Sequence, residues 1–298
     1  MDFTLRPMST SEVLDRMFYL YKKNFMLFAG IAILPAALSL IVRLAVIAAG
    51  GGVTKPAVFS PDTVILAGGA RFLDLLVLSI GGTMASAATV YALSMVHLDK
   101  TTSIGDSLKN VMPYFWRLMG VVFSVTLRVI GIGILMIVPF IIPVIGIPIG
   151  VVGLFVGLYF IVHLYARYSL AIPACVLEKI PSDKALERSS FLTKGRTGRI
   201  WLVFLLTGII NLALGAAIAL PVTLTVAVMT RGRLTLGLAI AAQVAQFLAS
   251  TLAGPIATVS IALLYYDERI RKEAFDLQYL MTAMDQPAQQ QAAATAGQ

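Results

Sequence analysis

The stretch STSEVLDRMFYLYKKNF at residues 9–25 runs directly into the apolar stretch MLFAGIAILPAAL at residues 26–38. In the first stretch apolar residues recur at helical spacing and charged residues take the other positions, which is typical of an amphipathic surface helix. The second stretch opens an apolar run that is long enough for a transmembrane helix. A surface helix followed by a membrane span is therefore the unit from which we interpret the rest of the chain.

The same order of features returns at residues 103–127, which read SIGDSLKNVMPYFWRL and then MGVVFSVTL, and at residues 181–209, which read PSDKALERSSFLTKGRTGR and then IWLVFLLTGI. An alignment of the three copies predicts that three leucines are equivalent: Leu14, Leu108 and Leu186. In the first two copies Ser9-x-x-Glu12 and Ser103-x-x-Asp106 have the spacing of a capping box, which satisfies backbone N–H groups at a helix start. The third copy has few large residues on its apolar face, so we expect it to deviate most.

The composition belongs to a membrane protein. Hydrophobic residues make up 58% of the 298 residues, charged residues only 13%, and the mean hydropathy is +0.88. Soluble domains carry about 25% charged residues. The only cysteine, Cys175, allows no disulfide within the chain. No cleavage site follows the first apolar run, so we expect an uncleaved first span.

We predict an all-α, polytopic fold with six transmembrane helices, arranged as three repeats of a cytoplasmic amphipathic helix plus a two-span hairpin. The six spans are expected at about 26–49, 72–97, 118–139, 146–172, 200–229 and 236–266. Residues 1–285 would form this membrane domain. The low-complexity tail at residues 286–298 is expected to be disordered.

The distribution of Lys and Arg predicts the orientation. Seventeen of them lie in the segments that hold the termini and the three surface helices, and four lie in the loops on the other side. Because positive residues favour the cytoplasmic side, both termini are expected there. In such a protein the net charge of +8 indicates attraction to anionic lipids rather than to nucleic acid.

Three stretches resemble a known family: RPMSTSEVLDRMFYLYKKNF at residues 6–25, ARYSLAIPACVLEKIPSDKALERSSFLTKGR at residues 166–196 and ALLYYDERIRKEAFDLQYL at residues 262–280. They are similar to the membrane domain of bacterial glycerophosphoryl diester phosphodiesterases. The resemblance covers residues 5–280 and implies a six-span protein of the bacterial inner membrane. In some members this domain is joined to a soluble catalytic barrel, which we do not expect here. The resemblance carries over no functional residues.

Ionisable and polar groups inside a span are costly, so each is a candidate for function. Counted at about 1.5 Å per residue, Arg128, His163 and Asn211 fall near the middle of the membrane at one level, where they could bind an anion. The alternative is structural: Arg128 could snorkel toward the interface, and the other two could hydrogen-bond between helices. We favour the structural alternative, and predict in either case that Arg128 faces the bundle interior.

Two further groups of charged residues have structural alternatives too. Arg43 and Asp74 fall near the outer ends of the first two spans, where we expect a structural ion pair. A basic patch of Lys194, Arg196 and Arg199 borders the fifth span and could bind anionic lipid headgroups, although general positive-inside bias also explains it. The surrounding glycines lack the spacing of a phosphate loop.

Two classes of function remain open. The first is a non-catalytic scaffold or accessory in envelope-lipid handling, with anionic lipids and other membrane proteins as partners. The second is a small transporter or lipid-translocating protein that uses the level of Arg128. We expect no enzyme activity, no metal and no cofactor, because no His, Cys and carboxylate cluster has ligand spacing.

Overall fold

A computed structural model describes residues 8–48, 61–98, 100–142, 146–229 and 236–273. Every regular element in these ranges is a helix. Six helical segments are long and apolar enough to cross a membrane. The protein is therefore an all-α polytopic membrane protein, as its sequence predicts.

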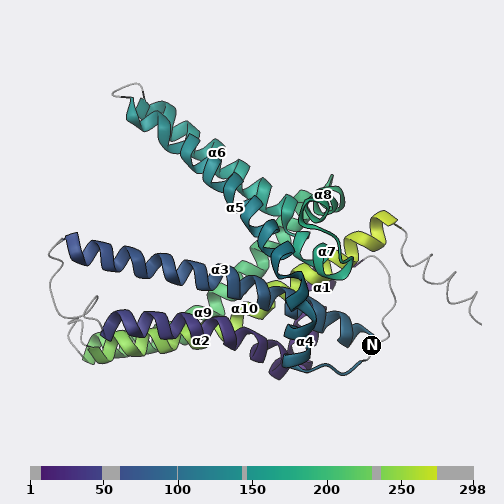
Figure 1. The fold of residues 1–298 in the computed structure, drawn as a ribbon, viewed down its shortest axis with the longest axis horizontal. Coiled ribbons are helices and arrows are strands. Elements are labelled where there is room, and N and C mark those ends of the chain that lie inside the picture. The colour runs from purple at the N-terminus through teal and green to yellow at the C-terminus, as the bar shows by residue number, and fades with distance from the viewer. Residues whose placement is uncertain (1–7, 49–60, 99, 143–145, 230–235, 274–298) are drawn as a thin grey trace, which may run out of the picture.

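The membrane helices form two arms that diverge from a common end (Figure 1). In the four-helix arm, α10 packs against α9 and α2, and α2 packs against α3. The hairpin arm consists of α5 packed against α6. The bounds of these helices are α2 Phe25–Ala48, α3 Pro61–His97, α5 Phe115–Ile137, α6 Gly146–Tyr168, α9 Thr197–Met229 and α10 Leu236–Glu273.

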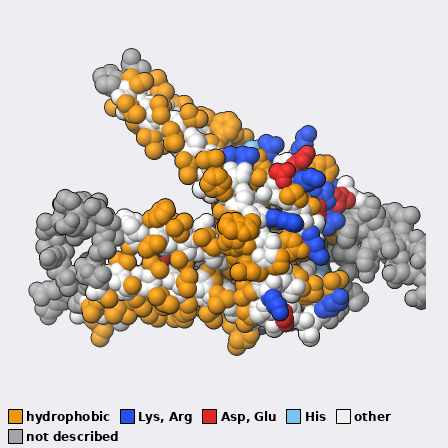
Figure 2. Space-filling model, viewed as in Figure 1, with side chains coloured by type: hydrophobic (Ala, Val, Ile, Leu, Met, Phe, Trp, Pro, Cys, Tyr) orange, Lys and Arg blue, Asp and Glu red, His pale blue; other side chains and the backbone are white. Residues whose placement is uncertain are grey.

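Four short helices lie where the arms meet: α1 Thr10–Lys23, α4 Ile104–Val111, α7 Ala171–Leu177 and α8 Ser182–Thr193. We call this region the charged end, because Lys, Arg, Asp and Glu side chains gather there while hydrophobic side chains cover both arms (Figure 2). The main hydrophobic core lies here too. It includes fully buried residues of α1, α7, α8 and α10, among them Met17, Ala174, Leu192 and Tyr265.

Burial differs strongly between the membrane helices. In the most apolar window of α10, 56% of the residues are buried, against 6% in the segment that contains α5. The helix α10 is thus the central element, and α5 exposes most of its surface. Exposed apolar side chains such as Phe123, Leu135 and Phe155 are what a helix surrounded by lipid requires, since lipid tails are themselves apolar.

The predicted caps differ in detail. Ser9 and Glu12 form the full capping box: the Ser9 hydroxyl accepts from the Glu12 N–H, and the Glu12 carboxylate accepts from the Ser9 N–H. Ser103 accepts from the Asp106 N–H in the same way, but the Asp106 carboxylate accepts from the Ser103 hydroxyl at 2.6 Å. Asp is one methylene shorter than Glu, which explains why only half of the second box forms.

Two predicted boundaries need correction. The helix α3 begins at Pro61, in the stretch between the first two predicted spans and well before the expected start at residue 72. The fourth span ends at Tyr168, and residues 171–177 form the separate helix α7. The surface helix of the second copy ends at Val111, as proline is expected to cause, since Pro113 lies in the 3₁₀ turn Met112–Tyr114 that separates it from α5. The predicted tail at residues 286–298 lies outside the described residues.

The alignment of the three copies coincides with the pattern of burial. The aligned positions Val13, Ser107 and Ala185 are all fully buried. One helical turn later, Met17, Val111 and Ser189 are fully buried as well. The same positions of α1, α4 and α8 therefore face the interior. Equivalence of the three complete helix-and-hairpin units remains a prediction.

Candidate functional site

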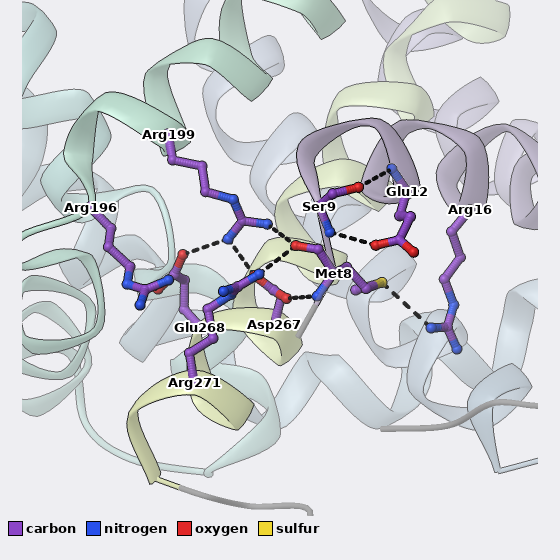
Figure 3. Close-up of polar contacts among 9 residues, drawn as sticks. All are labelled: Met8, Ser9, Glu12, Arg16, Arg196, Arg199, Asp267, Glu268 and Arg271. Carbon is purple, nitrogen blue, oxygen red and sulfur yellow. Dashed lines mark hydrogen bonds and ion pairs between the residues drawn. The ribbon is translucent and has the colours of Figure 1, made fainter. Parts of the chain in front are cut away.

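An ion-pair cluster in the charged end joins the start of α9, the last turns of α10 and residue 8 (Figure 3). Asp267 and Glu268 have fully buried side chains. Arg199 pairs with both, and its Nη1 lies 3.0 Å from Glu268 Oε1. The guanidinium of Arg271 contacts Asp267 Oδ2 at 2.8 Å. These contacts hold the first turn of α9 against α10.

Met8 completes this cluster through its backbone. Its N–H donates to Asp267 Oδ1 at 2.6 Å, and its carbonyl accepts from Arg199 Nη2 at 2.7 Å and from Arg271. The residue just before the Ser9 cap is thereby fixed to the opposite end of the chain. The sequence analysis did not find this cluster. Its signal was the acidic pair that directly follows the apolar run of the sixth span, opposite a basic loop.

A second ion-pair cluster links α7, α8 and α10. Arg188 Nε lies 2.9 Å from Glu178 Oε1, and its Nη2 pairs with Glu273. The Tyr265 hydroxyl donates to Glu178 Oε1 at 2.5 Å. Burial by itself would lower the pKa of Arg188, but the hydrogen bonds and charges of Glu178 and Glu273 outweigh it and raise the pKa. Arg188 therefore stays charged, and both clusters act as clamps between helices.

The three residues of the predicted headgroup patch do not all face outward at the charged end. Arg199 turns inward to the ion-pair cluster, and its side chain is only 18% exposed. Arg196 is 40% exposed and lies 3.9 Å from Glu268. The exposed Lys194 uses its carbonyl to accept a hydrogen bond from Lys272 at 2.8 Å. Only Lys194 and Arg196 present side chains to a headgroup.

The three polar residues predicted near the middle of the membrane do not come together. Arg128 is exposed on the hairpin arm, where it donates to the Ser124 carbonyl at 3.0 Å and lies 5.3 Å from the centre of the Tyr168 ring. His163 stacks on Tyr159. Asn211 donates to the carbonyl of Thr207 within its own helix. The prediction that Arg128 faces the bundle interior is therefore wrong.

Arg43 and Asp74 meet in the four-helix arm. Both Arg43 Nε and Nη2 lie 3.0 Å from Asp74 Oδ2, and the Ser39 hydroxyl donates to Asp74 Oδ1. Asp74 is only 6% exposed. Because both carboxylate oxygens have donors, this buried charge is compensated as a structural ion pair requires.

A cavity of about 710 Å³ adjoins this ion pair, between α2, α3, α9 and α10. Its polar lining includes Arg43, Arg71, Asp74, Gln243 and Gln246. The cavity lies at the end of the arm opposite to the charged end, since these residues are near the end of α2 and the beginnings of α3 and α10. It is the candidate binding site of the molecule. Among the described residues, no group of His, Cys, Asp and Glu could hold a metal ion.

Comparison with known families gives one match. The family model described as "Membrane domain of glycerophosphoryl diester phosphodiesterase" matches residues 135–291, which is more than half of the chain. No curated protein and no solved structure matches. The match includes two of the three stretches that suggested this family and leaves out the one at residues 6–25. The chain belongs to the family of membrane domains of glycerophosphoryl diester phosphodiesterases.

Proposed function

We propose that the chain is a non-catalytic membrane protein that serves as a scaffold or accessory in envelope-lipid handling. The observation that carries this proposal is the pair of diverging arms, which expose apolar side chains along their length and are clamped together only at the charged end (Figures 1 and 2). The opening between the arms offers lipid a large apolar surface. The family match supports a non-catalytic role, because it concerns the membrane domain.

We place the protein in the bacterial inner membrane with both termini in the cytoplasm, and propose anionic lipids and other membrane proteins as its partners. The clustering of Lys and Arg at the charged end supports this orientation, because positive residues remain preferentially on the cytoplasmic side. Lys194 and Arg196 would meet anionic headgroups there, each adding about 1 kcal/mol of attraction.

The second candidate is a lipid-translocating protein. What favours it is the cavity with two arginines inside the four-helix arm, since polar sites within membrane bundles often lie on substrate pathways. The level of Arg128 does not support it, because Arg128, His163 and Asn211 are not in contact.

The test is the lipid content of the full chain extracted from its own membrane with a polymer that retains surrounding lipid. We expect one or more anionic phospholipids to be enriched relative to the whole membrane. Another six-span protein from the same membrane serves as the control. A composition equal to that of the control would refute the role in lipid handling. Accelerated movement of labelled lipid between the leaflets of proteoliposomes would favour the second candidate instead.

A further inference from the structure

The cavity between α2, α3, α9 and α10 has an excess of positive charge. It is lined by two guanidinium groups, Arg43 and Arg71, and by one carboxylate, Asp74. The contacts of Arg43 with Asp74 use at most two of its five N–H donors. The remaining donors of Arg43 can serve a second acceptor that enters the cavity.

Arg71 is close enough for its charge to act on Asp74, but the direct contacts of that carboxylate are with Arg43 and Ser39. It precedes Asp74 by three residues on α3, so both side chains leave the same face of the helix. It makes no hydrogen bond or ion pair with any other residue that the structure describes. An exposed guanidinium beside a paired one can chelate an anion, and its planar fork fits the oxygens of a phosphate.

Gln243 adds a hydrogen-bond acceptor on the opposite wall. It belongs to α10, and its Oε1 is buried without a hydrogen-bond partner. A buried polar atom without a partner is rare in native structures and calls for an explanation. A ligand that carries both an anionic group and a hydrogen-bond donor would satisfy the arginines and Gln243 together.

The depth of the cavity indicates what this ligand is. Arg43 lies five residues before the end of α2 at Ala48, which is roughly 8 Å along a helix axis. The whole helix is about 36 Å long, a little more than the roughly 30 Å hydrocarbon core. Arg43 and Arg71 therefore lie close to the border of the core, where the phosphates of lipids are found.

We propose that this cavity binds a phosphate group, with Arg71 and Arg43 as its ligands and Gln243 as acceptor for a neighbouring hydroxyl or ammonium group. The phosphate could belong to a lipid headgroup or be free in solution. The second candidate function uses the same cavity but names no ligand for it; this inference names the ligand, and it depends on neither candidate function.

The experiment uses the full chain in detergent, washed free of phospholipid. Three probes are titrated: dioctanoyl phosphatidylglycerol, dioctanoylglycerol with the same chains and no phosphate, and inorganic phosphate. We expect phosphatidylglycerol to bind more tightly than dioctanoylglycerol. The substitution Arg71→Gln should weaken the binding of phosphatidylglycerol by about tenfold or more, because a charge-assisted hydrogen bond is lost. Gln243→Leu should weaken it by a smaller factor.

Lys109→Gln is the matched control, because it removes an exposed positive charge from α4 in the charged end and should leave binding unchanged. Arg43 is left intact, since its loss would leave Asp74 buried without a partner. Displacement of the lipid by inorganic phosphate would identify the phosphate group alone as sufficient, and failure to displace it would identify the lipid headgroup; both support the site. Equal binding of dioctanoylglycerol, or unchanged binding by Arg71→Gln, would overturn it. Unchanged binding of phosphatidylglycerol by Arg71→Gln, together with enrichment of anionic lipid around the chain in its own membrane, would overturn the site alone and leave the proposed function standing.

Discussion

Asp267 connects three other residues of the first ion-pair cluster. One oxygen accepts from the backbone of Met8, and the other pairs with Arg199 and Arg271. Since its side chain is fully buried, water cannot replace these contacts. Removing the carboxylate would leave the Met8 N–H without its acceptor and would take one acceptor each from Arg199 and Arg271, which keep the Met8 carbonyl.

We therefore expect Asp267→Ala to lower the free energy of unfolding by about 3–5 kcal/mol, the usual result of breaking a buried ion pair. Thermal unfolding of the full chain in detergent measures this change. The matched control is Asp183→Ala, which removes an exposed carboxylate from the first turn of α8 and should cost no more than about 1 kcal/mol. Equal losses in the two variants would show that the cluster contributes little.

Arg128 leads to the opposite expectation. It is exposed on the hairpin arm, and its contacts within the described part of the chain are with Ser124 and the Tyr168 ring. Because an arginine within a membrane-spanning segment is costly, Arg128→Leu should be neutral or stabilising in a lipid bilayer. Melting of the purified protein in nanodiscs tests this. A marked loss of stability would mean that Arg128 has a partner in the membrane that the structure does not show.

Depth along the membrane was the information that the sequence supplied about these polar residues. Counting along the spans predicts that Arg43 is near Asp74, and Arg43 Nη2 does lie 3.0 Å from Asp74 Oδ2. The same counting brings Arg128, His163 and Asn211 to one level, yet they are not in contact. Depth does not tell in which lateral direction a helix leaves the bundle, and α5 and α6 diverge from the four-helix arm.

At the scale of the elements, capping residues and apolar runs predicted most helices, and the misplaced boundaries have physical causes. Pro61, in a stretch rich in Gly and Pro, suggested a loop, but proline is favourable in the first turn of a helix. The break between α6 and α7 depends on a tertiary contact: the N–H of Leu170 donates to the Ser189 hydroxyl of α8 at 3.1 Å. No local pattern reveals such a contact.

Two adjacent glycines of α3 allow a test of how α2 and α3 pack. A Cβ atom at Gly81 would lie 2.9 Å from Cβ of Pro35 on α2, whereas a Cβ atom at Gly82 would meet nothing within 4 Å. The proline ring is rigid and cannot yield. Gly81→Ala should therefore lower the free energy of unfolding by about 1–3 kcal/mol through overpacking.

Gly82→Ala is the matched control for this contact. It should be neutral or stabilise the helix by up to about 1 kcal/mol, because alanine restricts the unfolded chain more than glycine does. Thermal unfolding of both variants decides the matter. If the two variants unfold at the same temperature, the close approach of Gly81 to Pro35 does not contribute to packing.

At the scale of the whole molecule, the six spans follow from composition, whereas their grouping into two arms does not. All six apolar runs look alike in sequence, yet 56% of the most apolar window is buried in α10 and only 6% in the segment that contains α5. At the charged end, α10 carries the partners of both ion-pair clusters. The helix α9 also carries a partner, Arg199, yet only 11% of its most apolar window is buried, so flanking charges alone do not decide which span becomes central.

The orientation of the whole molecule gives the last prediction, which uses single cysteines in a Cys175→Ala background. With both termini in the cytoplasm, Ser60→Cys, in the chain between α2 and α3, should react with an impermeant thiol reagent in intact cells. Lys184→Cys, exposed on α8, should react only after the cells are made permeable. The physical reason is the positive-inside rule, because the charged end carries most of the Lys and Arg. Cys175 itself is fully buried, so its replacement removes only a small background. Labelling of Lys184→Cys but not of Ser60→Cys in intact cells would contradict this prediction. It would mean that the orientation is the opposite one, with the phosphate cavity near the cytoplasmic side of the membrane.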